Sequence, residues 1–236
     1  AKGFQGIFVG SGAGLPNFMD IPGENALNIM SSNEYLTRVN LMDAANPSTD
    51  TPINLGKKVL VVGGGNTAMD SCRTAKRLGA DVTLVYRRSE AEMPARIEEV
   101  KHAKEEDIKF LTLHNPKEYL TDENGAVKAA VLDVMQLGEP DQSGRRRPET
   151  TGKTITIECD QVIVAVGVSP NPLVPKSIEG LTLGRKNTIA VNDQMQSSRK
   201  EIYAGGDIVR GGATVILAMG DGRRAAMNMS KQLTEA

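Results

Sequence analysis

The chain has 236 residues, enough for one large or two modest domains, and its formal net charge is −1. The balanced charge, the absence of Trp and the low count of four Tyr and four Phe argue against a nucleic-acid partner. No apolar stretch is long enough to cross a bilayer and no signal peptide is seen, so we expect a cytoplasmic protein without a membrane partner. The two cysteines, Cys72 and Cys159, form no C-x-x-C pair, and we expect no dithiol centre and no metal site.

The first predicted element is a strand that runs into glycines, Gly6-Ile7-Phe8-Val9-Gly10-Ser11-Gly12-Ala13-Gly14. Leu15-Pro16 follows without a helical pattern, whereas a phosphate-binding turn needs a helix N-terminus at that point. We therefore predict a strand that leads into a loop. A helix is predicted next, from a Ser–Glu capping box that starts at Ser31 to about Ala45.

The strongest signal is the run Val59-Leu60-Val61-Val62-Gly63-Gly64-Gly65-Asn66-Thr67-Ala68-Met69-Asp70. Four apolar residues predict a parallel strand covered on both faces, and the glycines that follow fit the pattern G-x-G-x-x-G/A before a helix. A helix N-terminus there suits an anion, so the run predicts a dinucleotide site, with a purely structural turn as the alternative. The predicted site residues are Gly63, Gly64, Gly65, Asn66, Thr67 and Ala68.

The next predicted strand, Val82 to Tyr86, runs directly into Arg87 and Arg88. NAD sites usually carry a carboxylate near this point, whereas two guanidinium groups suit the 2′-phosphate of NADP. The pair therefore favours NADPH, and a solvated loop end is the alternative. Arg96, on the predicted helix that follows, is a further candidate for the same group.

An antiparallel excursion is predicted between the strand 108–113 and the end of the sheet. Residues 127–138 and 153–158 form its strands, joined by a turn-rich loop over 139–152. That loop carries Arg145-Arg146-Arg147, which we expect to be solvated rather than a binding patch. The parallel sheet resumes at 162–167.

The last segment carries a second signal, Ile202-Tyr203-Ala204-Gly205-Gly206-Asp207. An Asp beside close-approach glycines can bond a ligand hydroxyl, and a turn without a ligand is the alternative. Thr214 then opens a predicted helix whose inner face includes Val215 and Met219, and whose N-terminus can face a partial negative charge.

Taken together, these motifs resemble those of the two-dinucleotide flavoprotein oxidoreductases, in particular the small (beta) subunit of NADPH-dependent glutamate synthase and its relatives. The resemblance covers nearly the whole chain and rests on the combination of motifs. The motifs are Gly63-Gly64-Gly65-Asn66-Thr67-Ala68-Met69-Asp70, Tyr86-Arg87-Arg88 with Glu92-Met93-Pro94, Gly138-Glu139-Pro140 with Gly144-Arg145-Arg146-Arg147, and Ala204-Gly205-Gly206-Asp207-Ile208-Val209.

The resemblance implies an α/β fold in which a Rossmann-like, three-layer ββα NADPH domain is inserted into an FAD domain. Residues 51–167 would form the NADPH domain, and residues 1–50 and 168–236 would be two pieces of a partial FAD-binding domain. Its implied cofactor contacts, besides those above, are Gly206 and Asp207 at the FAD ribityl–pyrophosphate region, Thr214 and Val215 near the flavin ring, and Gly10 and Gly167 in strand-to-loop elements.

Two parts of the family's pattern are missing from this sequence. One is the strand–G-x-G-x-x-G–helix that begins the family's FAD domain, and the other is its cysteine-rich domain for 4Fe-4S clusters. Two cysteines cannot hold a cubane cluster, which needs about four thiolates. We therefore expect a C-terminal fragment with an incomplete FAD site and with the clusters in a missing N-terminal domain.

The resemblance further implies hydride transfer from NADPH to FAD and single-electron exit through the clusters. The partner would be the glutamate synthase large subunit, which makes glutamate from glutamine and 2-oxoglutarate, or another electron acceptor. Hydride transfer needs no protein acid or base, so we name no catalytic residue. An NAD(P)H–ferredoxin oxidoreductase or other electron-input subunit, a nucleotide-binding module without turnover, and a homo-oligomer stay open.

Overall fold

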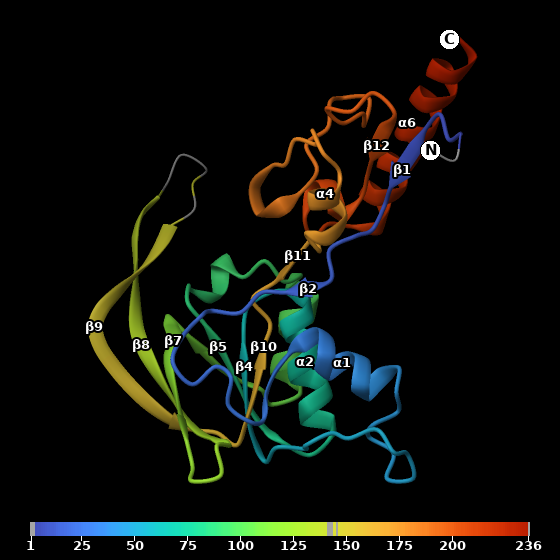
Figure 1. Cartoon of the computed structure of the whole chain (residues 1–236). Helices are drawn as coiled ribbons and strands as arrows, with labels where there is room; N and C mark the ends of the chain where they lie inside the picture. The colour runs from blue at the N-terminus through green and yellow to red at the C-terminus, as the bar shows by residue number, and fades with distance from the viewer. Residues whose placement is uncertain (1–2, 141–143, 145, 236) are drawn as a thin grey trace. The chain divides into compact units, whose positions relative to one another are not determined.

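The chain divides into two compact units in the computed structural model, which describes residues 3–140, 144 and 146–235. The split unit comprises Ala1–Leu15 and Val168–Ala236, and the inserted unit comprises Pro16–Gly167. The chain passes from one unit to the other at two short strands, β2 (Leu15–Pro16) and β11 (Val168–Ser169) (Figure 1).

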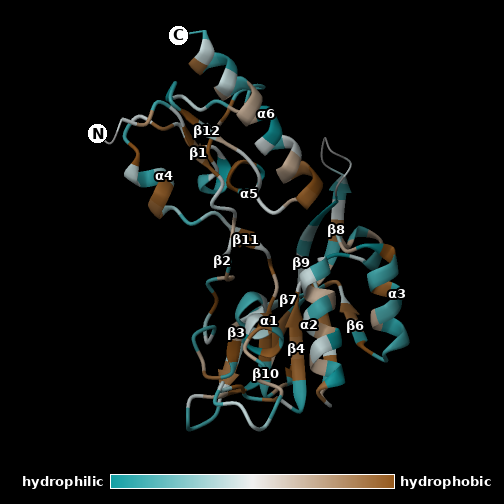
Figure 2. Ribbon diagram, turned by 90° about the vertical axis from the view of Figure 1, so that its right-hand side faces the viewer, coloured by the Kyte–Doolittle hydropathy of each residue, from teal (hydrophilic) through white to brown (hydrophobic). Residues whose placement is uncertain are grey.

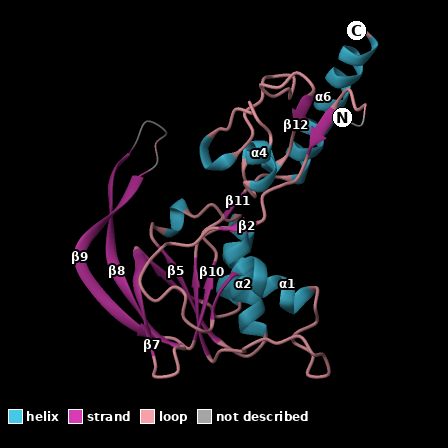
Figure 3. Ribbon diagram, viewed as in Figure 1, coloured by secondary structure: helices cyan, strands magenta, loops and turns pink. Residues whose placement is uncertain are grey.

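A five-stranded parallel sheet forms the middle of the inserted unit, and its strand order is β3-β10-β4-β5-β6. Figure 3 draws strands of this sheet in magenta, with β5 and β10 labelled. All four residues of β10 and four of the five in β4 are buried, which is the pattern expected of parallel strands covered on both faces. The strands are β3 (Ile29–Ser31), β4 (Lys58–Val62), β5 (Asp81–Tyr86), β6 (Lys109–Thr112) and β10 (Gln161–Val164).

Helices pack against one face of this sheet, and Figure 2 shows its strands largely in brown. The packing helix α2 (Asn66–Arg77) buries Met69, Cys72 and Ala75 against β4 and β5, as its apolar spacing predicts. The other helices of the unit are α1 (Ser32–Asn40), η1 (Glu90–Glu92) and α3 (Ile97–Glu105).

The predicted start of α1 is confirmed, whereas its predicted end is wrong. The Ser31 hydroxyl accepts from the Glu34 N–H at 3.2 Å, but the Glu34 carboxylate binds Arg38 instead of closing a capping box. The helix ends at Asn40, about a turn before Ala45.

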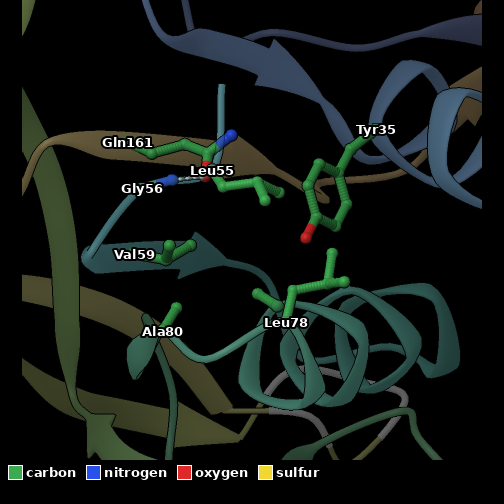
Figure 4. A pocket seen from close by; sticks show the side chains of 8 residues that line it. Tyr35, Leu55, Gly56, Val59, Leu78, Ala80 and Gln161 are labelled. Carbon is green, nitrogen blue, oxygen red and sulfur yellow. Dashed lines mark hydrogen bonds between the residues drawn. The ribbon is translucent and has the colours of Figure 1, made fainter. Parts of the chain in front are cut away.

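Tyr35 of α1 packs at the amino-terminal ends of the parallel strands, where its side chain faces Leu78 (Figure 4). Burial raises the pKa of the Tyr35 phenol to about 12. Beside it, the buried Gln161 amide accepts from the Gly56 N–H at 3.0 Å and donates to the Asn54 carbonyl at 2.9 Å. These two bonds hold the segment that leads into β4.

A three-stranded antiparallel sheet covers the other face, so the inserted unit has three layers. Its strands are β7 (His114–Thr121), β8 (Val127–Pro140) and β9 (Arg146–Glu158). The predicted excursion is confirmed, but the predicted loop over 139–152 is wrong. Thr150 pairs with Met135, and Arg146 pairs with Pro140, so the strand continues almost to the tip of the hairpin. Arg145 lies outside the described residues.

The split unit holds a two-stranded parallel sheet in which β1 (Ile7–Val9) pairs with β12 (Ile202–Ala204). As predicted, β1 leads into a loop and not into a helix. The remaining elements are α4 (Leu173–Ser177), η2 (Arg185–Asn187), α5 (Asp207–Arg210) and α6 (Val215–Thr234). No helix in the described ranges is both long and apolar enough to span a membrane.

The division into units differs from the predicted boundary at residue 50. Residues 16–50 group with the inserted unit, because β3 pairs with β10 and α1 packs against α2. The second predicted boundary, after Gly167, coincides with the division. Which cofactor each unit binds stays a prediction.

Gly23 and Gly125 provide a matched pair for testing how tightly the layers of the inserted unit pack. Both have a φ of +79°, but a Cβ at Gly23 would lie 2.1 Å from the Tyr119 carbonyl oxygen, whereas a Cβ at Gly125 meets nothing. We expect Gly125→Ala to cost about 1–2 kcal/mol for the left-handed backbone. Gly23→Ala adds about 1–3 kcal/mol of overpacking, measured as the free energy of unfolding in urea. Equal losses for the two variants would contradict the close packing.

Candidate functional site

The glycine turn after β4 packs closely between the ends of the two neighbouring strands, β5 and β10. The Gly63 N–H donates to the Val85 carbonyl at 3.0 Å, and Gly63 has a φ of +145°. A Cβ at Gly63 would lie 2.3 Å from the Ala165 carbonyl oxygen. Only glycine fits this position, because both the backbone conformation and the close approach exclude a side chain.

The second half of the turn opens to solvent. A Cβ at Gly64 would lie 2.6 Å from the Tyr86 ring, but a Cβ at Gly65 meets no atom within 4 Å. Gly65 is the N-cap of α2, and no side chain among the described residues caps this helix end. The first N–H groups of α2 are therefore available to an anion, and the backbone of Gly65 can be approached closely.

The remaining turn residues hold the neighbouring loop in place. The Asn66 side-chain oxygen accepts from the Arg96 N–H at 2.9 Å, and the Gly64 carbonyl accepts from the Ala95 N–H at 3.1 Å. Thr67 is exposed and Ala68 is fully buried against the sheet. Arg96 is the N-cap of α3 and not a residue of the helix itself. Its side chain is exposed near the turn. Burial raises the pKa of the nearby Asp70 and the Glu99 carboxylate adds to this rise, while the charges of Arg73 and Arg96 partly oppose it.

Arg87 and Arg88 follow β5 at the edge of the sheet that carries the glycine turn, because β4 and β5 are parallel neighbours. The Arg87 side chain is exposed. Arg88 donates from Nε to the Arg146 carbonyl at 3.0 Å. Gly167 lies beyond β10 at the same edge, with a φ of +102°, and its carbonyl accepts from the Asn17 N–H at 3.0 Å. The inserted unit thus brings these predicted residues to one edge.

A second set of predicted residues meets at the carboxyl edge of the sheet in the split unit. Gly10 follows β1 and lies beside Gly205, whose N–H donates to the Val9 carbonyl at 3.3 Å. Gly206 has a φ of +76°. Asp207, half-buried, accepts through Oδ1 from the Ala213 N–H at 3.1 Å and so closes the turn before α6.

Thr214 caps α6 as predicted, since its hydroxyl accepts from the Leu217 N–H at 3.4 Å. The predicted inner face of α6 is wrong at Val215 and Met219, which are 76% and 70% exposed, and Asp221 and Ala225 are buried instead. Farther along the helix, Met229 packs against the core as predicted. The helix can lie close to the end of β12 at Asp221 because residue 205 is glycine. A Cβ added at Gly205 would lie 2.8 Å from the Asp221 Cβ.

Asp221 is the residue of this region that sequence reasoning missed. Its carboxylate is 1% exposed, accepts twice from the Arg210 guanidinium at 2.6 Å, and accepts from the Gly206 N–H at 3.1 Å. The Arg210 hydrogen bonds hold the pKa of Asp221 below its usual range. The only sequence signal is a single acidic residue between the apolar start of the helix and Arg223-Arg224, which has no specificity by itself.

The two edges differ in what they can do chemically. The edge with the glycine turn offers an uncapped helix, open backbone and exposed arginines, which suits a phosphorylated ligand. The edge with Asp207 offers a helix N-terminus and a carboxylate partly used by the backbone. Within the described ranges no cluster of three or more His, Cys, Asp or Glu side chains is placed to hold a metal ion.

Comparison with known proteins matches residues 3–222 to the family model described as pyridine nucleotide-disulphide oxidoreductase. The chain is 37% identical over 99% of its length to a protein of Moorella thermoacetica named NADP(+)-dependent formate dehydrogenase subunit beta, and covers 32% of it. It is 35% identical over 97% of its length to a protein of Cereibacter sphaeroides named putative glutamate synthase [NADPH] small chain, and covers 56% of that protein. The chain thus spans about a third to just over half of these relatives.

Solved structures share the fold at low sequence identity. Mycobacterium tuberculosis FprA, solved in complex with NADPH, superposes with a TM-score of 0.80 at 19% identity, over 98% of this chain and 64% of FprA. Thioredoxin reductase of T. acidophilum superposes with a TM-score of 0.73 at 19% identity, over 96% of this chain and 65% of the enzyme. The predicted α/β fold class is confirmed.

The Asp221–Arg210 pair makes the stability of the split unit depend on pH. Because the folded pKa of Asp221 is lowered, its stabilising contribution is present above the unfolded pKa of about 3.9 and is lost as pH falls through the folded pKa. We expect Asp221→Asn to lower the free energy of unfolding by about 2–3 kcal/mol at pH 7, with the difference from wild type shrinking below about pH 4. The exposed Asp193→Asn is the control. A loss that does not change between pH 7 and pH 3 would contradict the ion-pair explanation.

Proposed function

The chain belongs to the pyridine nucleotide-disulphide oxidoreductase family, and from this premise we propose that it is the NADPH-binding part of a flavoprotein oxidoreductase. NADPH binds at the glycine turn of the inserted unit, and the split unit contributes part of an FAD site. When bound, the two cofactors supply hydride donation and hydride acceptance. The protein binds and orients them, and no side chain serves as acid or base.

The observation that carries this proposal is the open space at Gly65 beside the uncapped N-terminus of α2. A pyrophosphate needs both a backbone without a side chain and unpaired N–H groups, and this turn offers the two together. Gly63, Gly64 and Ala68 shape the turn, while Asn66 and Thr67 stand at its rim. Gly167 stands at the same edge.

The exposed Arg87 supports the choice of NADPH over NADH. It follows β5 directly, at the position where an NAD site usually carries a carboxylate. Arg88 and Arg96 bring two more cations to this edge, and Arg88 keeps free donors, because only its Nε is used by a protein group in the described chain. A 2′-phosphate is a dianion that such guanidinium groups recognise in bidentate fashion.

The split unit fits part of an FAD site. Gly206 and Asp207 stand beside Gly10 at the end of the parallel pair, and Thr214 and Val215 form the exposed N-terminus of α6. The α6 N–H groups suit a partial negative charge on a flavin ring, and the Asp207 carboxylate suits a ribityl hydroxyl. The described residues contain a single strand–glycine–helix turn of the dinucleotide type, at Gly63, so the ADP half of FAD has no site among them.

For the complete protein we propose the role of a glutamate synthase small subunit, with iron–sulfur clusters outside this chain and a large subunit as electron acceptor in the cytoplasm. Relatives with that name support it. A second candidate is an electron-input subunit for another acceptor, which the formate dehydrogenase and NADPH-Fe(3+) oxidoreductase relatives favour.

Removal of the Arg87 charge tests the cofactor assignment. We expect Arg87→Ala to weaken NADPH binding by about 10- to 100-fold and NADH binding little, since a charge-assisted phosphate bond contributes about 1.5–3 kcal/mol. Titration calorimetry with both cofactors measures this. Lys57→Ala, an exposed cation at the opposite edge of the sheet, is the matched control. Equal losses for NADPH and NADH would refute the 2′-phosphate role.

A diaphorase assay on the 236-residue chain separates an electron-transfer enzyme from a nucleotide-binding module. We expect NADPH-dependent dye reduction with added FAD, and less of it for Gly65→Ala, because a methyl group fills the space left for the pyrophosphate. Measurable NADPH binding without dye reduction at saturating FAD would favour the module without turnover.

A further inference from the structure

The tip of the β8–β9 hairpin is tied to the edge of the parallel sheet by Arg88. Its Nε donates to the Arg146 carbonyl at 3.0 Å, across 58 residues of sequence. The register partner of Arg146 is Pro140, which has no N–H to offer. The Arg88 guanidinium thus donates a hydrogen bond to the Arg146 carbonyl that Pro140, on the paired strand β8, cannot donate.

A second chain of hydrogen bonds holds the hairpin to the same residue. The Arg88 carbonyl accepts from the Leu113 N–H at 3.0 Å, and the Leu113 carbonyl accepts from the Met135 N–H at 2.7 Å. Leu113 has a φ of +55°, an unusual conformation for a branched residue. Arg88 is therefore fixed to the middle of the hairpin through its backbone and to the tip through its side chain.

Arg146 and Arg147, the two described arginines at the start of β9, differ in their contacts. Arg146 donates from Nε to the Gly138 carbonyl at 3.0 Å and from Nη2 to the Leu137 carbonyl at 3.1 Å, so it braces the hairpin itself. Arg147 is exposed, and neither it nor Arg87 has an ion-pair partner within the described chain. The Arg147 N–H belongs to the same peptide as the carbonyl that Arg88 holds, so the Arg147 Cα lies within about 6 Å of Arg88 Nε.

We propose that the start of β9 at the hairpin tip, Arg146 and Arg147, is part of the NADPH site, with Arg147 as a further cation for the 2′-phosphate beside Arg87 and with Arg88 as the residue that positions Arg147. This inference rests on the NADPH site proposed above. It reverses the sequence-based expectation that the arginine triplet is only solvated, because the expected loop is a strand whose end is anchored at the cofactor edge.

The charge of the ligand explains why a further cation would be placed there. A 2′-phosphate carries about two negative charges near neutral pH, and Arg147 adds an exposed guanidinium to the arginines that already stand at this edge. Nicotinamide dinucleotides without this phosphate make no use of the tip. The hairpin therefore contributes to selectivity between the two cofactors and not to binding of the shared pyrophosphate.

The test uses the full chain and two small probes, 2′,5′-ADP and 5′-AMP, in titration calorimetry. We expect Arg147→Gln to weaken 2′,5′-ADP by about 10-fold or more and to leave 5′-AMP unchanged. The matched control is Lys153→Gln, which removes an exposed cation from the same strand farther from the tip. Wild-type affinity of Arg147→Gln for 2′,5′-ADP would overturn the inference while leaving the NADPH proposal intact. A wild-type chain that does not discriminate between the probes would overturn both.

Coupling between Arg88 and Arg147 tests the positioning role. Arg88→Lys keeps the charge but loses the directed Nε bond to the hairpin. We expect the loss caused by Arg147→Gln to be several-fold smaller in the Arg88→Lys background, and amide exchange at Arg146 and Arg147 to be faster in Arg88→Lys. Additive effects, with unchanged exchange at the tip, would show that Arg88 does not position Arg147.

Discussion

The close approach of the Gly63 backbone to the Ala165 carbonyl is the constraint on which the candidate site depends. Because no Cβ fits there, the chain can turn directly at the end of β4 and start α2 over the same edge. The N-terminus of α2, the half-buried Gly65 and the residues after β5 thereby meet at one place. A side chain at Gly63 would push the turn away from β10 and separate the groups that suit a pyrophosphate.

The antiparallel sheet covers the second face of the parallel sheet and also extends to the edge that carries the candidate site. Its long hairpin returns to the edge where β5 ends, and Arg88 links the two by side chain and backbone. One part of the antiparallel sheet packs against Leu60 and Val85, and another part lies beside the candidate cofactor site. Arg88 therefore contributes to the packing of the two layers and lies at the edge that carries the candidate site.

The split unit shows how a buried charge can shape a turn. Asp221 takes the Gly206 N–H and the Arg210 guanidinium together, and this fixes the left-handed turn that presents Asp207 and leads to α6. On the same helix, apolar residues at the start of α6, such as Val215 and Ile216, are exposed while the polar Asp221 is buried. The sequence analysis placed Val215 on the inner face because helical periodicity assumes that apolar side chains face inward.

Local patterns determined what depends on neighbours in sequence: the buried strand, glycine turn and helix at Val59 to Ala68, the strand-then-loop at Gly10, and the capping of α6 by Thr214. Each follows from backbone sterics or from a hydrogen bond that spans a few residues. Tertiary structure alone decided the contacts between distant residues. These include the pairing of β3 with β10, the extension of β9 to Arg146, the Asp221–Arg210 pair and the bond from Arg88 to the hairpin. Such contacts depend on which surfaces meet after folding, and local sequence patterns do not determine which surfaces these are.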